Sequence, residues 1–408
     1  MPSLPLHADT AELFNIAGML AGIEASGGIS RALLAKKLGL SRTTASTIVS
    51  RLLAAGLVAE RSSDEGPRLE ARADGRGRPG ILLDLGTQRW FALGAEYHSG
   101  RWAFAITNLK GGIVASATRP VPEDSPEAFL STLLEGLREA MLLCPGELLP
   151  AIGIGAPGLV DCGSGRIIRA DDLGWISVPV GETVSAALGL ETYVINRNRG
   201  SGLAEARFGV GKGVHSLVYI GIGTGISAAF VSDGSLLHGS SYSAGEIGHV
   251  VMDAEGPVCR CGKRGCLQVL SSGLAMARRA SALIASGRAS SLEPVPPAQL
   301  RGEEVCAAAA DGDPVATQSL REAASSLGLA VANIITTFNP DKVILGGPVG
   351  QVEGPFLDLV KAETARWAMD YPYQAVRIER GRLGEFTGAL GAACLVLDRK
   401  LALALGAR

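Results

Sequence analysis

Three cysteines and a histidine have the spacing of a metal site. Cys259, Cys261 and Cys266 follow the pattern Cys-x-Cys-x4-Cys, and His249 lies ten residues before the first of them. Thiolates and imidazole together form tetrahedral zinc sites, and four protein ligands leave no position open for water. The pattern therefore predicts a structural Zn²⁺ held by these four residues. Three reduced thiols in an ordinary turn are the alternative.

The segment before residue 60 carries side chains that suit nucleic acid. Between Ala25 and Glu60, every charged residue that precedes Glu60 is basic. Ser41 and Arg42 are followed by short hydroxyl side chains, a combination that can hydrogen-bond to base edges and phosphates. An ordinary solvated helix is the alternative. The predicted DNA contacts are Arg31, Ser41, Arg42, Thr43, Thr44, Ser46, Thr47 and Arg51.

Predicted helices and a hairpin would position these side chains. Apolar residues at helical spacing predict a first helix around residues 15–25, and a Gly-Gly pair ends it. Ser30 and Ser41 are N-cap types that would begin a second and a third helix. Two extended stretches, from Gly56 and at residues 81–85, can pair as a wing. This order predicts a winged helix-turn-helix whose third helix enters the major groove.

The linker after the wing contains a second candidate contact with DNA. Residues 75–79 read GRGRP, so Arg76 and Arg78 project from an extended backbone with little bulk. Such a segment can enter a narrow minor groove. A flexible charged linker explains the same composition, and both interpretations stay open.

From about Trp90 the sequence changes to alternating strands, Gly-rich turns and helices, which predicts an α/β fold. A chain of 408 residues exceeds what one hydrophobic core usually supports, so we expect two or three domains. Strand-like segments lie at residues 91–94, 101–107, 151–154, 192–195 and 216–221.

The sequence also bears on the compartment. The first residues lack a basic-then-apolar signal segment, and the longest apolar runs are too short and too often broken by glycine to span a bilayer. We therefore expect a cytoplasmic protein with no membrane partner. In a reducing compartment, a tight cysteine cluster indicates metal binding more than disulfides.

Several motifs together resemble the ROK family of repressors, open reading frames and sugar kinases. The cysteine motif with GEIGH upstream is the most specific of them. The motifs are GIGAPGLVD at residues 153–161, SAGEIGH at 243–249, CRCGKRGC at 259–266 and NPDKVILGG at 339–347. The resemblance implies an actin-like, two-lobed ATPase fold of the sugar-kinase type. With the winged helix, it implies a reader with linker at 1–85, a first lobe at 86–200, a second lobe with the zinc loop at 201–386, and a C-terminal helix at 387–408 that packs back on the first lobe.

The chain departs from the kinase members of this family at the catalytic base. Those members have an Asp in a Glu-Asn-Asp-Ala-Asn motif, and the matching residues here read INRNR, with Arg197 at the base position. A guanidinium stays protonated and cannot accept a proton near neutral pH. The kinase phosphate loop, Asp-x-Gly-Gly-Thr-Lys, reads EYHSGR at residues 96–101, and its side chains stand where phosphates need open backbone. We therefore expect no kinase activity.

The resemblance also implies a sugar site. Glu246 and His249 match sugar contacts of the family, whereas Asp172 replaces the usual Asn and Gln268 the usual Glu. Carboxylates and amides of this kind pair with sugar hydroxyls. The predicted effector contacts are Asp172, Asn196, Arg197, Glu246, His249 and Gln268.

Arg197 and Arg199 raise a further hypothesis about the effector. Arginine forks suit phosphate and carboxylate, so the effector would be a sugar phosphate or a sugar acid. In the alternative, Arg197 forms an ion pair with an acid such as Glu205 or Asp172 and fills space.

These features predict a sugar-responsive transcription regulator that represses carbohydrate-utilisation genes. One reader contacts one half-site, so we expect a homo-oligomer, a dimer or a tetramer, on operator DNA. Two other interpretations remain: a constitutive DNA-binding regulator with a degenerate cleft, and an active sugar kinase with an added reader.

Overall fold

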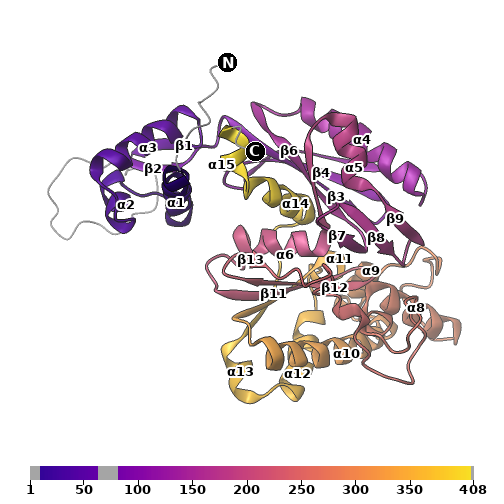
Figure 1. Cartoon of the computed structure of the whole chain (residues 1–408). Coiled ribbons are helices and arrows are strands. Elements are labelled where there is room, and N and C mark those ends of the chain that lie inside the picture. Colours follow the sequence, from indigo (N-terminus) through magenta and orange to yellow (C-terminus); the bar gives the residue numbers. More distant parts are fainter. Residues whose placement is uncertain (1–9, 63–80, 406–408) are drawn as a thin grey trace.

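A computed structural model of the chain describes residues 10–62 and 81–405. Its N-terminal elements are α1 (Thr10–Ser26), α2 (Arg31–Lys37), α3 (Arg42–Ala54), β1 (Val58–Ser62) and β2 (Ile81–Leu85) (Figure 1). The hydroxyls of Ser30 and Ser41 cap α2 and α3 by accepting the backbone N–H groups of Leu33 and Thr44. β1 and β2 pair antiparallel as a wing. The predicted winged helix-turn-helix is confirmed, and we refer to it as the reader.

The first lobe is built on a mixed sheet with strand order β10-β6-β3-β4-β5. β6 pairs parallel with β10 and β3, and β3, β4 and β5 form an antiparallel meander. The strands are β3 (Trp90–His98), β4 (Arg101–Asn108), β5 (Ile113–Pro120), β6 (Glu147–Ala156) and β10 (Glu191–Asn196). A small sheet of β7 (Leu159–Asp161), β8 (Arg166–Ala170) and β9 (Trp175–Val178) and the helices α4 (Pro126–Leu142) and α5 (Val180–Leu188) complete the lobe.

The second lobe is built on a sheet with strand order β13-β12-β11-β14-β15. These strands are β11 (Ser216–Ile222), β12 (Ile226–Ser232), β13 (Ser235–Leu236), β14 (Lys342–Gly346) and β15 (Arg377–Arg380). The helical segments are η1 (Ile247–His249), α7 (Leu267–Ser271), α8 (Gly273–Ala285), α9 (Gly302–Ala310), α10 (Pro314–Phe338), α11 (Gly347–Gly350), α12 (Phe356–Trp367) and α13 (Asp370–Ala375). The strand segments predicted from sequence all lie within β3, β4, β6, β10 and β11.

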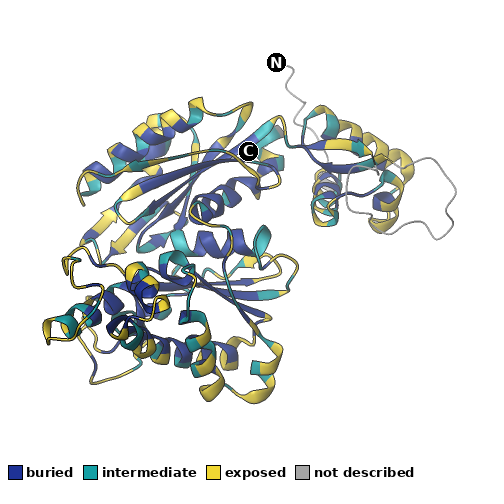
Figure 2. Cartoon of the chain, turned by 180° about the vertical axis from the view of Figure 1, so that it is seen from behind, coloured by how far each residue is buried: buried dark blue, intermediate teal, exposed yellow. Residues whose placement is uncertain are grey.

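Each lobe buries its own core. The central strands of both sheets are buried, whereas the edge strand β5 and the outward faces of the helices are largely exposed (Figure 2). In the first lobe the core includes an aromatic cluster of Tyr97, Trp102, Phe129 and Trp175. Along the described residues, no helix combines the length and apolar character needed to cross a bilayer.

Between the lobes, helix α6 (Arg197–Arg207) crosses α14 (Thr387–Leu397) at a pair of glycines. A Cβ on Gly391 would lie 2.0 Å from the carbonyl oxygen of Gly200, so any larger residue would force the helices apart. α14 also lies directly on the first-lobe sheet. A Cβ on Gly94 or Gly153 would come within 2.0 and 1.9 Å of carbonyl oxygens of α14. α15 (Lys400–Leu405) follows as a separate helix.

The reader shares a hydrophobic core with the first lobe and the C-terminal helices. Met19 and Leu52 of the reader belong to the same buried cluster as Leu149 of β6 and Val396 of α14. The indole N–H of Trp90 donates to the Ala55 carbonyl at 2.6 Å. The reader is thus docked on the lobe, and α15 lies between the two (Figure 1).

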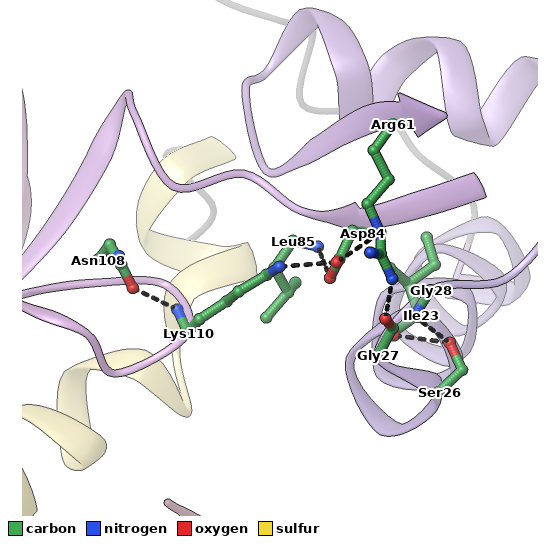
Figure 3. Close-up of polar contacts among 9 residues, drawn as sticks. All are labelled: Ile23, Ser26, Gly27, Gly28, Arg61, Asp84, Leu85, Asn108 and Lys110. Atoms are coloured by element: carbon green, nitrogen blue, oxygen red, sulfur yellow. Dashed lines mark hydrogen bonds and ion pairs between the residues drawn. The ribbon is translucent and has the colours of Figure 1, made fainter. Parts of the chain in front are cut away.

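Asp84 is the polar centre of this junction. Asp84 is 6% exposed, and its carboxylate lies 3.2 Å from Nε of Arg61 on the wing and 2.7 Å from Nζ of Lys110 in the first lobe (Figure 3). Arg61 also donates to the Gly27 carbonyl at 2.5 Å, at the end of α1. One carboxylate therefore ties the wing, the first helix of the reader and the first lobe together.

The crossing of α6 and α14 can be tested with two glycine substitutions. We expect Gly391→Ala to lower the free energy of unfolding by about 2 kcal/mol or more, because the added methyl has no space. A Cβ added at Gly18 in α1 would have no atom within 4 Å. Gly18→Ala should therefore raise stability by about 0.5–1 kcal/mol, as expected inside a helix. Urea unfolding measures both, and equal effects would contradict the tight crossing.

Candidate functional site

The side chains of the predicted metal site come together in the second lobe. The ligand atoms of His249, Cys259, Cys261 and Cys266 lie within 4.8 Å of one another. The sulfurs of Cys261 and Cys266 are 3.7 Å apart, and Nδ1 of His249 is 3.8 Å from Sγ of Cys259. Zn–S bonds of about 2.3 Å in a tetrahedron place two sulfurs about 3.8 Å apart. The donor set and its spacing therefore fit one tetrahedral Zn²⁺.

A cavity of about 610 Å³ lies beside this cluster and is lined by residues of both lobes. The effector contacts predicted from sequence all line it, namely Asp172, Asn196, Arg197, Glu246, His249 and Gln268. His249 belongs to both sets, which two ring nitrogens allow. Gln268 donates from Nε2 to Sγ of Cys259 at 3.4 Å, so it links the cysteine cluster to the cavity.

Asn196 is mostly engaged in holding the backbone. Its Oδ1 accepts the N–H groups of Asn198 and Arg199 and so caps α6, while its Nδ2 donates to the Gly158 carbonyl at 2.8 Å. One amide hydrogen remains for a ligand. Asn196 therefore shapes the cavity floor by fixing the start of α6.

Arg199 does not line the cavity, contrary to its suggested place beside the sugar. Its side chain is 1% exposed, and Nη2 lies 3.6 Å from Oε1 of Glu246. Burial raises the pKa of Glu246, and the Arg199 guanidinium opposes part of that rise. Arg199 thus lies behind Glu246 and favours its ionised form.

Arg197 begins α6 and lies on the cavity floor. Its Nη1 donates to Nδ1 of His98 at 2.9 Å and to the Tyr97 carbonyl at 3.4 Å. Burial and then the charge of Arg197 lower the pKa of His98 to about 3, so this ring is neutral and Nδ1 can accept. Arg197 forms no ion pair with Glu205 or Asp172. Glu205 instead accepts backbone N–H groups such as that of Val210, and Asp172 lies 3.9 Å from Arg260.

A smaller cavity of about 350 Å³ is also lined by Arg197, which thus borders both cavities. Glu96 of β3 lines it and is 8% exposed. Burial raises the pKa of Glu96 to about 7, although Arg197, the Gly388 N–H and Arg101 oppose the rise. The Tyr97 ring does not fill this cavity, since it packs in the aromatic cluster of the first lobe.

Arg260 reaches from the second lobe to the first, and the sequence did not single it out. It lies between two cysteines of the metal cluster, and its Nη1 donates to the Asp172 carbonyl of the first lobe at 2.6 Å. Its position between Cys259 and Cys261 is the signal that could have found it. The metal loop therefore closes one side of the cavity.

On the reader, α3 presents a polar, exposed face. Exposed residues among the predicted contacts are Ser41, Arg42, Thr43, Thr44, Ser46, Thr47 and Arg51. Arg31 forms an ion pair with Glu60, and Arg51 with Glu12. Arg42 takes part in no ion pair among the described residues, and so its charge is available to DNA. Arg76 and Arg78 lie outside the described residues.

The buried Glu96 predicts a pH dependence of stability. Its pKa of about 7 in the folded chain lies above its ordinary 4.5, so the folded form binds the proton more tightly. Ionisation of Glu96 therefore lowers the free energy of unfolding as the pH rises from 4.5 to 7. The free energy of unfolding of Glu96→Gln, taken relative to that of wild type, should therefore rise by about 2–3 kcal/mol between pH 5 and pH 8. Urea unfolding at both pH values, with the exposed Glu353→Gln as control, measures this, and parallel pH profiles for Glu96→Gln and wild type would refute it.

Comparison with known proteins places these features in a family. The model described as ROK family matches residues 94–399, about three quarters of the chain, and the MarR family model matches residues 17–68. A putative xylose repressor from Caldicellulosiruptor sp. (strain Rt8B.4) is 28% identical, over 92% of this chain and 93% of its own length.

Two solved structures agree with this assignment. The crystal structure of a ROK family transcriptional regulator, a homolog of the E. coli MLC protein, matches with a TM-score of 0.81 at 28% identity and covers 98% of both chains. A ROK family glucokinase from Streptomyces griseus, in complex with glucose and AMPPNP, matches with a TM-score of 0.68 at 27% identity, over 75% of this chain and 98% of that one. The chain therefore belongs to the ROK family and carries a MarR-type winged helix ahead of its ROK domain.

Proposed function

We propose that this protein is a sugar-responsive, DNA-binding transcription repressor that carries out no phosphoryl transfer. The observation that carries the proposal is a reader docked on a two-lobed domain whose interlobe cavity ends on Arg197. Two relatives of similar length, the putative xylose repressor and the MLC homolog, support it. We propose a cytoplasmic homodimer on a near-palindromic operator, since one reader covers one half-site.

The chemistry of the cavity floor supports the absence of kinase activity. A sugar hydroxyl must lose a proton to attack a phosphoryl group, and a positioned base accepts it. Arg197 cannot accept a proton, and its neighbour His98 has a pKa of about 3 and already receives a hydrogen bond from Arg197. Neither group at the floor therefore serves as a base near neutral pH.

A path of direct contacts joins the cavity to the reader. α6 begins at the cavity with Arg197, and its backbone lies directly against that of α14 at Gly391. Beyond α14, Lys400 of α15 forms an ion pair at 2.6 Å with Glu24 of α1. Closure of the cleft on a sugar would move α6 and α14 together and so shift the paired readers. The resulting change in DNA affinity is typically ~1–3 kcal/mol.

We assign a structural Zn²⁺ to His249, Cys259, Cys261 and Cys266. When bound, the ion would supply four bonds that fix the loop bearing Arg260, and a site with four protein ligands has no open position for catalysis. The loop in turn borders the cavity. Zinc therefore supports the effector site through the position of this loop.

The DNA proposal is tested by fluorescence anisotropy with DNA from upstream of the gene, across a salt series and with a panel of neutral sugars and sugar phosphates. We expect specific, salt-sensitive binding that one compound of the panel weakens. Arg42→Ala should lower the affinity roughly 10- to 100-fold, because a base or phosphate contact is lost. Arg366→Ala, an exposed arginine of the second lobe, is the control. Unchanged binding by Arg42→Ala would contradict the role of α3, and binding that no compound alters would contradict the effector response.

The zinc proposal is tested by metal analysis of the purified protein. We expect one Zn²⁺ per chain, and Cys261→Ser should release it and lower the melting temperature. Cys144→Ser is the matched control, because Cys144 lies outside the cluster and should leave metal content unchanged. Protein purified without zinc, or a zinc content equal in both variants, would overturn the assignment.

A further inference from the structure

The arginines around the large cavity differ in whether a carboxylate neutralises them. Arg169 pairs with Asp171, and Arg260 lies 3.9 Å from a carboxylate oxygen of Asp172. Among the described residues, Arg197 and Arg301 line the same cavity and form no ion pair. Two positive charges of one cavity are therefore not neutralised by an ion pair within the described residues.

These two arginines reach the same place from different parts of the chain. Arg197 follows β10 of the first lobe, whereas Arg301 precedes α9 of the second lobe. Both contribute to the low pKa of His98, as does Arg101, so their charges converge on the turn between β3 and β4. Arg101 is neutralised by Glu385 at 2.7 Å. Positive charges from both lobes thus act on His98.

We infer that the effector carries an anionic group, a phosphate or a carboxylate, that binds between Arg197 and Arg301. This inference rests on the proposed function and names the effector class of the same cavity. Guanidinium groups bind both anions through paired N–H groups, and an anion between them would cancel their repulsion. The anion would therefore hold the two lobes together by binding one arginine of each, while hydroxyls of the sugar contact Glu246 and its neighbours.

Bare backbone and two acids surround Arg197. On the second-lobe side, Gly223 lines the smaller cavity, and a Cβ built there would lie 3.9 Å from Nη2 of Arg197. The opposing acids are Asp124, which accepts the Tyr97 hydroxyl at 3.3 Å, and Glu96, whose pKa of about 7 leaves it partly neutral. These acids therefore offset only part of the positive charge of the two arginines.

Sulfate is a suitable probe, because it resembles phosphate and keeps its charge near neutral pH. Thermal unfolding is followed against sulfate, with chloride at matched ionic strength as reference, for wild type, Arg197→Gln, Arg301→Gln and the control Arg166→Gln. Arg166 lies on β8 outside the cavity lining and contacts Glu182 at 3.4 Å. We expect a sulfate-specific rise in melting temperature for wild type and Arg166→Gln, since a ligand that binds only the folded state stabilises it.

Arg197→Gln and Arg301→Gln should each weaken sulfate binding roughly tenfold or more. No sulfate-specific rise in wild type, or the same rise in all variants, would overturn the inference. The experiment uses no DNA, so it is independent of the reader. If a neutral sugar weakens DNA binding equally in wild type and Arg197→Gln while sulfate has no effect, the inference fails and the repressor function stands. If sulfate binds as expected but the protein shows no specific DNA binding, the inference stands and the repressor function fails.

Discussion

The contact of α6 with α14 is the constraint on which the architecture depends. Glycines at the crossing, and glycines of β3 and β6 beneath it, let backbone lie directly on backbone. Interiors packed in this way transmit displacement because they have little space to absorb it. α6 starts on the cavity floor and α14 lies in the core shared with the reader, so the two ends of the molecule are joined by one rigid unit.

Much of the fold was predictable because it depends on local signals. Ser30 and Ser41 cap the helices they were predicted to cap, and the wing pairs as expected. The cysteine spacing predicted a cluster whose atoms meet, and the effector residues predicted from family motifs share one cavity. Short spacings and motifs carry this information because neighbouring residues in sequence are neighbours in the site.

The contacts that sequence could not predict join distant segments. Arg199 was placed beside the sugar, yet its side chain is buried behind Glu246, since one helical turn decides which side chain faces the cavity. Arg301 joins the cavity from a position 104 residues after Arg197, and no local pattern marks it. No local pattern marks the ion pair of Asp84 with Lys110, because only the docking of the reader on the lobe brings the two together.

The place of α14 also bears on the order of folding during synthesis. The first-lobe sheet is made of strands that end at Asn196, but α14, which covers it, spans Thr387–Leu397. Until the ribosome has released that helix, the face of β3 and β6 that α14 covers stays exposed. The reader is made first, but its contacts with α14 and α15 form last, so an unfinished chain carries a reader that lacks the C-terminal part of its support.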